Sequence, residues 1–161
     1  MKSHFCVVRQ YNKDKLAKYR FDFFILADSH GYFIYHLDFY QGKNKANIDI
    51  HPLVKHLPTT QKAVANAILK SQIHNDKDGC RYLFMDNRYA ALQLLALMLT
   101  NYNIRAVGTC KANCVGFDSD KLSVPCNAPR GTYARLVDKR LGMVISCWKD
   151  SKVLQTVSTV M

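Results

Sequence analysis

The sequence predicts an α/β protein in which helices lie against the faces of a mixed β-sheet, and two observations lead to this prediction. Apolar, aromatic-rich runs typical of strands occur before, between and after two segments with helical periodicity. At 161 residues the chain has the length of one ordinary domain, which buries about two thirds of its unfolded surface on folding. We therefore expect one domain over residues 1–161, with a basic arm at 1–20 and the sheet and helices at 21–161.

A hairpin is expected first. Residues 21–29 are almost continuously apolar and aromatic, which is typical of a strand, and this strand ends at Asp28. Gly31 supplies the residue that tight reversals favour, and residues 32–40 resume as a second aromatic-rich strand. Asp28 is also typical of a turn residue that opens a hairpin.

The next 30 residues contain a connection and a helix. The stretch 41–58 is polar and broken by Gly42, Pro52 and Pro58, which predicts a connection. Thr59 or Thr60 is a suitable cap for a helix over 61–71, which places Val64, Ala67 and Ile68 on one face.

A strand and a second helix follow. Residues 80–86 predict a short strand that ends at Asp86. Asp86 or Asn87 then fits the cap of a helix over 89–101, which is apolar nearly all round and is therefore expected to be buried.

The last third of the chain favours strands. Residues 104–110 predict a strand, residues 111–131 a long loop, and the remainder two or three strands, at 132–140, 141–150 and 152–160. No repeat or low-complexity tract interrupts this order.

The six cysteines are scattered through apolar surroundings, which suits reduced thiols better than a disulfide framework. Cys110 and Cys114 have the spacing of half a zinc site, but the chain offers no second half of CxxC or HxxxH type. The longest apolar run, 90–99, is too short to span a bilayer, and the start does not resemble a secretory signal. We expect an intracellular protein with no membrane contact.

The charge balance predicts a polyanionic partner. Twenty-three basic residues face twelve acidic ones, and the formal net charge is +11. Basic and aromatic residues alternate in 11–21, which indicates either a grip on a phosphate backbone or an exposed basic arm. Every acidic residue is an aspartate, so any carboxylate chemistry must use Asp.

Asp28 and Asp86 both follow predicted strands. If these strands lie parallel and adjacent, both carboxylates project into one crevice at the carboxyl edge of the sheet. Two carboxylates and substrate phosphates are ligands that Mg2+ accepts, and a pair of such ions serves phosphoryl transfer. The pattern therefore indicates a candidate magnesium site. Two alternatives remain open: Asp86 as a helix cap and Asp28 as a turn residue.

The chain resembles the transposase domain of piggyBac-type elements. The matching segments occur in the family's order: QYNKDKLAKYRFDFFILADSHGY, FYQGK, YLFMDNRYAALQLLALM, IRAVGTCKAN and VISCWKDSKVLQTVST. The resemblance implies a ribonuclease-H-like fold, three metal-binding aspartates, two Mg2+ ions, and hydrolysis followed by strand transfer on DNA. By position, Asp28 resembles the first of these aspartates and Asp86 the second.

The chain also departs from the family. The third aspartate lies in a Gly-Val-Asp type motif after a segment resembling LQTVST, and the sequence stops at Met161 before reaching it. We therefore expect a C-terminally incomplete sheet and an incomplete triad. Asp138 and Asp150 are the remaining candidates in the late strands, and Asp150 matches a non-catalytic family position beside Trp148. The family usually has one more residue between the Ser and Gly of the hairpin turn.

Three functions follow as hypotheses. The first is a non-enzymatic DNA-binding remnant; the second is an active nuclease or transposase that obtains its third ligand from another chain or from water; the third is a transposon fragment with no role. No small-molecule substrate is expected; the partners are DNA and, for assembly, a second copy or a full-length transposase, in the nucleus. The phosphate-contact candidates are Arg20, Lys43, Lys45, Arg88, Lys111, Arg130, Lys149 and Lys152.

Overall fold

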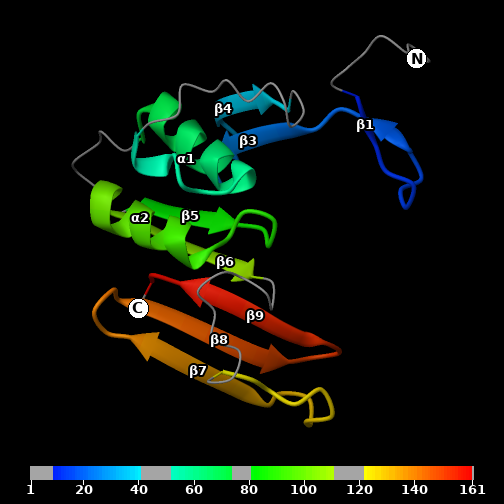
Figure 1. The fold of residues 1–161 in the computed structure, drawn as a ribbon, viewed down its shortest axis with the longest axis vertical. Helices are drawn as coiled ribbons and strands as arrows, with labels where there is room; N and C mark the ends of the chain where they lie inside the picture. Colours follow the sequence, from blue (N-terminus) through cyan, green and yellow to red (C-terminus); the bar gives the residue numbers. More distant parts are fainter. Residues whose placement is uncertain (1–8, 41–51, 74–80, 111–121, 161) are drawn as a thin grey trace. The chain divides into compact units, whose positions relative to one another are not determined.

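The computed structural model describes residues 9–40, 52–73, 81–110 and 122–160 (Figure 1). The chain divides into two compact units, one of residues 1–56 and 62–73, the other of residues 57–61 and 74–161. In the described ranges, no helix is both long and apolar enough to cross a membrane.

The first unit begins with a small antiparallel pair. Strands β1 (Gln10–Tyr11) and β2 (Tyr19–Arg20) pair with each other. Next to the pair, the N–H of Asn12 donates to the carbonyl of Lys18 at 2.8 Å. The Arg9 guanidinium lies 4.1 Å from the centroid of the Tyr19 ring. The described part of the expected basic arm is thus a hairpin in which cations and aromatic rings are in contact.

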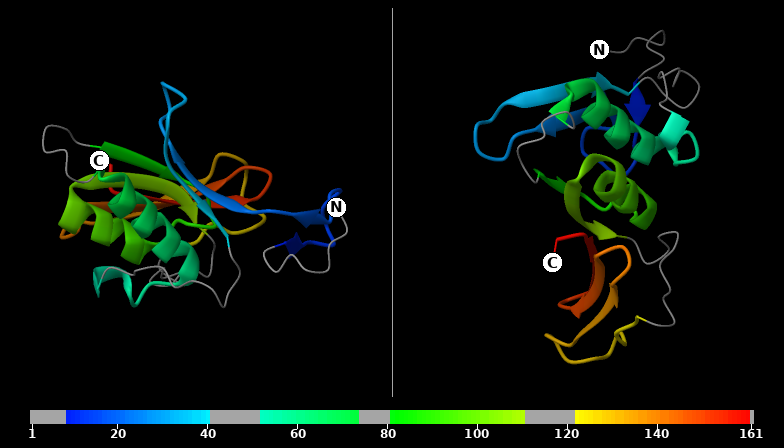
Figure 2. Two further views of the ribbon diagram at one scale, coloured as in Figure 1. Left: turned by 90° about the horizontal axis from the view of Figure 1, so that it is seen from above. Right: turned by 90° about the vertical axis from the view of Figure 1, so that its left-hand side faces the viewer.

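A second hairpin follows, as the sequence predicts. Strands β3 (Phe23–Ala27) and β4 (Ile34–Phe39) are antiparallel and form a two-stranded ribbon, blue in Figure 2. The register pairs Phe23 with Phe39, whose ring centroids lie 5.1 Å apart. A register shift between Leu26 and Ala27 bends the ribbon just before Asp28.

Helix α1 (Thr59–Ser71) starts directly after Pro58, and a short 3-10 helix, η1 (Pro52–Val54), precedes it. Both threonines expected as caps lie inside the helix, because it begins two positions earlier than the pattern indicates. Ala67 and Ile68 are buried as predicted, whereas Val64 is half-buried.

The second unit contains a five-stranded mixed sheet in the order β5-β6-β9-β8-β7 (Figure 1). Its strands are β5 (Arg81–Met85), β6 (Ile104–Cys110), β7 (Tyr133–Asp138), β8 (Met143–Lys149) and β9 (Val153–Ser158). The pair β5–β6 is parallel and the pairs β6–β9, β9–β8 and β8–β7 are antiparallel. The predicted mixed α/β sheet and its late strands are confirmed.

Helix α2 (Leu92–Tyr102) covers one face of this sheet. Its Leu95 packs in a core with Ala106, Met143 and Val157. The expected start at Tyr89 is wrong. The expected burial is found for Leu94, Leu95 and Met98, whereas Gln93 and Thr100 on the other side are exposed. The helix ends at Asn103, whose φ of 52° is the left-handed value common at helix ends.

A smaller cluster completes the same face. Leu122 and Val124 pack on Cys147 of β8, and Ala134 and Val153 lie against them. Cys110 and Cys147 are buried free thiols, and Cys126 is an exposed one, as expected for reduced cysteines. The suggested zinc half-site includes Cys114, which lies outside the described residues.

The residue that follows β9 is hydrogen-bonded to β6 through its side chain and its backbone. The buried Thr159 hydroxyl oxygen accepts the backbone N–H of Ala106 at 2.7 Å, and the Thr159 N–H donates to the Ala106 carbonyl at 2.9 Å. The side chain therefore satisfies a backbone donor where the strand ladder stops.

Candidate metal and nucleic-acid site

Asp28 lies at the end of β3 and closes the hairpin turn. Its Oδ2 accepts the backbone N–H of Gly31 at 2.6 Å, and its own N–H donates to the Phe33 carbonyl at 2.8 Å. The N–H groups of Gly31 and then His30 hold the pKa of Asp28 below its ordinary value, because they favour the ionised form. The turn interpretation is confirmed, and the same contacts keep the group anionic, as a metal ligand must be.

Gly31 has a role in this turn that the sequence pattern did not reveal. A Cβ atom at this position would lie 2.8 Å from Asp28 Oδ2, closer than a side chain permits. The absence of a side chain therefore allows the carboxylate to reach the backbone N–H. The spacing of an aspartate three residues before a glycine is the only sequence signal of this contact.

Asp86 follows β5 and is exposed. Its Oδ1 accepts the N–H of Asn87 at 2.6 Å, and its carbonyl accepts the N–H groups of Tyr89 and Ala90 at 2.9 and 3.1 Å. The helix-cap interpretation is wrong for both Asp86 and Asn87, since α2 has Ala91 as its N-cap with no side-chain cap bond. A separate turn places the Asp86 carboxylate at the strand end.

Gly108 of β6 lies beside this turn. It is in register with Met85, the residue before Asp86. A Cβ atom on Gly108 would lie 2.7 Å from the Met85 carbonyl oxygen and 2.8 Å from the Ala90 Cβ. Only glycine permits this close packing of β6 against both ends of the turn, so Gly108 is a positioning residue for Asp86. An isolated glycine within a strand pattern is the signal that points to it.

The two aspartates belong to different units, Asp28 to the first and Asp86 to the second. In the described strands β3 pairs with β4 and β5 pairs with β6, so the direct parallel pairing of the two aspartate-bearing strands is not found. No group of three or more His, Cys, Asp or Glu side chains gathers in the described part of the chain.

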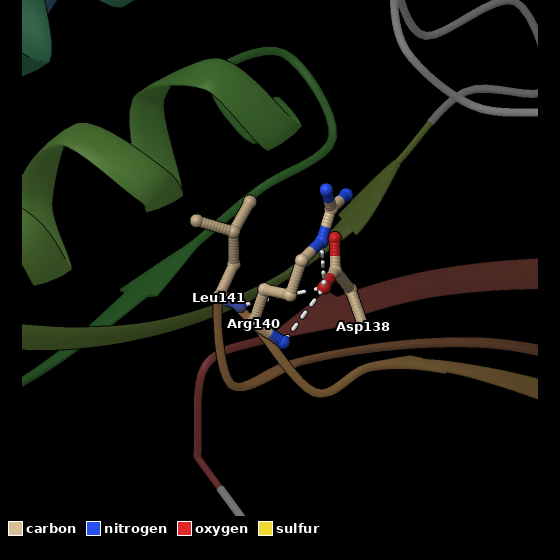
Figure 3. A network of polar contacts seen from close by, with 3 residues as sticks. All are labelled: Asp138, Arg140 and Leu141. Carbon is tan, nitrogen blue, oxygen red and sulfur yellow. Dashed lines mark hydrogen bonds and ion pairs between the residues drawn. The ribbon is translucent and has the colours of Figure 1, made fainter.

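Asp138 has a structural role in the turn that follows β7 (Figure 3). Its Oδ1 accepts the backbone N–H of Arg140 at 2.9 Å and lies 3.6 Å from the Arg140 Nε. These contacts lower the pKa of Asp138, the Arg140 N–H having the largest effect. They close the turn between β7 and β8.

Asp150 is engaged in the next turn. Its Oδ1 lies 2.5 Å from the Nε of Arg130, and its backbone N–H donates to the Lys152 carbonyl at 3.0 Å. Each of the two late aspartates therefore makes contacts within a turn of the sheet.

The phosphate-contact candidates differ in their surroundings. Arg20 Nε lies 2.8 Å from Asp22 Oδ1, and Arg130 pairs with Asp150, so two of the guanidiniums already face carboxylates. The Arg88 guanidinium lies 6.0 Å from the Tyr89 ring centroid in the Asp86 turn. Lys152 is exposed and Lys149 is half-buried. Lys43, Lys45 and Lys111 lie outside the described residues.

Comparisons with known proteins agree with this architecture. The sequence model of the family described as Transposase IS4 matches residues 2–161. The cryo-EM structure of a piggyBac transposase synaptic complex with hairpin DNA superposes with a TM-score of 0.76 at 20% sequence identity. The match covers 96% of this chain and 30% of that transposase, and no curated protein matches.

The structural likeness confirms the predicted ribonuclease-H-like fold, and the family match extends over nearly the whole chain. Together they confirm the resemblance that the aspartate-bearing segments carry. The chain belongs to the Transposase IS4 family and is a transposase-type domain related to piggyBac.

Proposed function

We propose that this domain binds DNA through its phosphate backbone and that its present role is DNA binding rather than complete transposition. The observation that supports this is a formal net charge of +11 on a chain of the transposase family. The solved relative is titled as a complex with hairpin DNA. Phosphate contacts give affinity with little sequence preference.

Arg88 and Lys152 are the best described candidates for these contacts. Both residues are exposed, so their cationic groups are accessible to a DNA backbone. Arg88 also lies two residues after Asp86, so a phosphate held there lies near the candidate metal ligand.

Fluorescence anisotropy with a labelled duplex tests this proposal. The logarithm of the affinity should fall linearly with the logarithm of salt concentration, with a slope of about −0.9 per phosphate contact. Arg88→Gln and Lys152→Gln should each make this slope shallower by about 0.9. Lys70→Gln, at an exposed position on α1, changes the charge equally and should leave the slope unchanged. Absence of binding at about 50 mM salt would refute the proposal.

Asp28 and Asp86 are the residues that would hold Mg2+, the ion expected of this family. Each carboxylate stands at the carboxyl end of a strand and uses one oxygen for a backbone N–H bond. A carboxylate has about four acceptor sites, so both groups keep capacity for a cation. When bound, divalent ions activate the attacking oxygen and stabilise the leaving oxygen of phosphoryl transfer. The lowered pKa of Asp28 fits this assignment.

Calorimetric titration with Mg2+ tests the metal assignment without requiring catalysis. Asp28→Asn and Asp86→Asn should each weaken binding about tenfold or more, since each removes a charged ligand. Asp14→Asn makes the same chemical change at an exposed site in the first hairpin and should have no effect. Equal affinities in all four proteins would refute the assignment.

An active nuclease is the second candidate function. It is favoured by the ionised Asp28 and the exposed Asp86, both at strand ends. A third ligand would complete the metal site. Metal-dependent nicking of a supercoiled plasmid that disappears in Asp28→Asn and Asp86→Asn would establish this function, and no nicking by the parent protein would exclude it.

A nuclear location is part of the same proposal, because DNA is the expected partner. Imaging of a fluorescent fusion in cells tests it. Exclusion of the fusion from the nucleus would contradict a role on chromosomal DNA.

A further inference from the structure

The five-stranded sheet has one packed face and one face whose large side chains are exposed. Ala134, Cys147 and Val153 pack in the core on the first face. Because side chains alternate along a strand, their neighbours Tyr133, Trp148 and Leu154 point to the other face. We refer to the six residues Tyr133, Arg135, Ser146, Trp148, Leu154 and Thr156 on β7, β8 and β9 as the open corner.

Three large side chains of the open corner are adjacent. The strand register places Trp148 opposite both Tyr133 and Leu154. Directly opposed residues in an antiparallel pair have Cβ atoms about 5 Å apart. Their exposed fractions are 72% for Tyr133, 47% for Trp148 and 43% for Leu154. Two rings and a leucine therefore form a continuous apolar row in solvent.

The next row of the open corner is polar and cationic. Arg135 is opposite Ser146, and Ser146 is opposite Thr156. Arg135 is exposed. The described acidic residues of this unit lie elsewhere: Asp86 follows β5, Asp138 closes a turn, and Asp150 pairs with Arg130. A guanidinium next to aromatic rings, without a described carboxylate on the same face, favours an anionic partner.

A similar arrangement occurs on the same face at the other edge of the sheet. Tyr82 and Phe84 of β5 are exposed, and Tyr82 is in register with Arg105 of β6. Four strand spacings of about 4.8 Å separate β5 from β7, which corresponds to the reach of a few nucleotides. Exposed rings beside an arginine thus lie at both ends of the sheet.

We propose that the open corner binds single-stranded DNA, with unpaired bases stacked on Trp148 and Tyr133 and a phosphate paired with Arg135. Flat rings match the faces of unpaired bases, the guanidinium matches the phosphate, and the hydroxyls of Ser146 and Thr156 match polar base edges. A base pair inside a duplex does not offer its flat face to such a row. The inference rests on the proposed function only in taking DNA as the partner, and it involves neither Asp28 nor Asp86.

Trp148 is the only tryptophan in the chain, so its emission reports directly on the open corner. An oligothymidine of about ten nucleotides, a length within the usual site size, should quench this emission on binding. A blunt duplex should leave the emission nearly unchanged even where anisotropy shows that it binds.

Variants measured by anisotropy of the labelled oligothymidine locate the site. Tyr133→Leu and Trp148→Leu keep apolar area but remove a ring, and each should weaken binding roughly fivefold or more. Trp148→Phe keeps a ring and should restore most of the affinity. Arg135→Gln should weaken binding, whereas Arg140→Gln should not, because Arg140 pairs with Asp138 in the adjoining turn.

The outcomes separate this inference from the proposed function. Two results would overturn the open-corner proposal alone. One is duplex binding without oligothymidine binding, and the other is oligothymidine binding that leaves Trp148 emission unchanged and is unaffected in the variants. Oligothymidine binding with quenching but no duplex binding would support the open corner and refute the general phosphate-binding role. Absence of binding to either DNA would refute both.

Discussion

The backbone N–H of Gly31 donates to Oδ2 of Asp28 at 2.6 Å, and the space that a Gly31 side chain would occupy is filled by that carboxylate oxygen. One glycine thus both stabilises the charge on the first candidate ligand and leaves room for it.

Gly31→Ala should raise the pKa of Asp28 toward its ordinary value of about 3.9. The new Cβ would lie 2.8 Å from Oδ2, so the carboxylate must move away from the N–H that favours its ionised form. NMR titration of the Asp28 side-chain carboxyl carbon measures the change. Asp14, remote in the sequence and exposed, is the internal control, and an unchanged Asp28 titration would show that the contact has no electrostatic effect.

The stability contributed by Asp28 should depend on pH in a defined direction. Its pKa is lower in the folded protein, so the folded state favours the ionised form and the contribution is fully present above the unfolded value of about 3.9. It should be lost as the pH falls through the lower folded value. Urea unfolding of the parent and Asp28→Asn at a series of pH values measures this. A difference that grows on acidification would have the wrong sign.

Gly108→Ala should destabilise the protein by about 1–3 kcal/mol, because the added methyl group overpacks against the Met85 carbonyl and Ala90. Urea unfolding gives the loss, and amide chemical shifts of residues 85–90 show whether the Asp86 turn moves. Thr109→Ala, at the exposed neighbouring position of β6, is the control and should change stability little. Parent-like stability and shifts in Gly108→Ala would argue against the close packing.

Leu95→Ala should cost about 2–5 kcal/mol of unfolding free energy, because Leu95 is fully buried in the core between α2 and the sheet. Gln93→Ala on the exposed side of the same helix should stay within about 0.5 kcal/mol of the parent. Chemical denaturation compares the two. Equal effects would mean that α2 does not pack as described.

Thr159→Val should cost about 1–3 kcal/mol, because it leaves the buried N–H of Ala106 without its hydroxyl partner. Thr159→Ser keeps the hydroxyl and should recover most of the loss. Hydrogen exchange of the Ala106 amide is the specific measurement, and it should speed up in the valine variant alone. Equal exchange in both variants would contradict the role of the Thr159 hydroxyl as the partner of this amide.

The sequence was most informative where a pattern is local. Alternation and aromatic content predicted the β3–β4 hairpin and all three late strands, and the apolar run before Asp86 predicted β5. The start of α2 was missed because an aspartate before a helix is a frequent cap, whereas here the Asp86 carbonyl closes a separate turn with Tyr89 and Ala90.

Long-range order was harder to predict. Insertion of β9 between β6 and β8 depends on contacts such as Val157 in the core and Thr159 with Ala106, which join residues about 50 positions apart. No local periodicity encodes such a partner. The role of Gly108 was missed for a related reason, since it depends on a neighbouring strand.

The strand order has a practical consequence for anyone dissecting the protein. Among the described strands, β5 has a neighbour on one side only, so it presents a row of amide and carbonyl groups flanked by the exposed rings of Tyr82 and Phe84. Such a row is a template for intermolecular β-addition. Self-association or precipitation is therefore expected of a fragment of residues 74–161 that carries this edge.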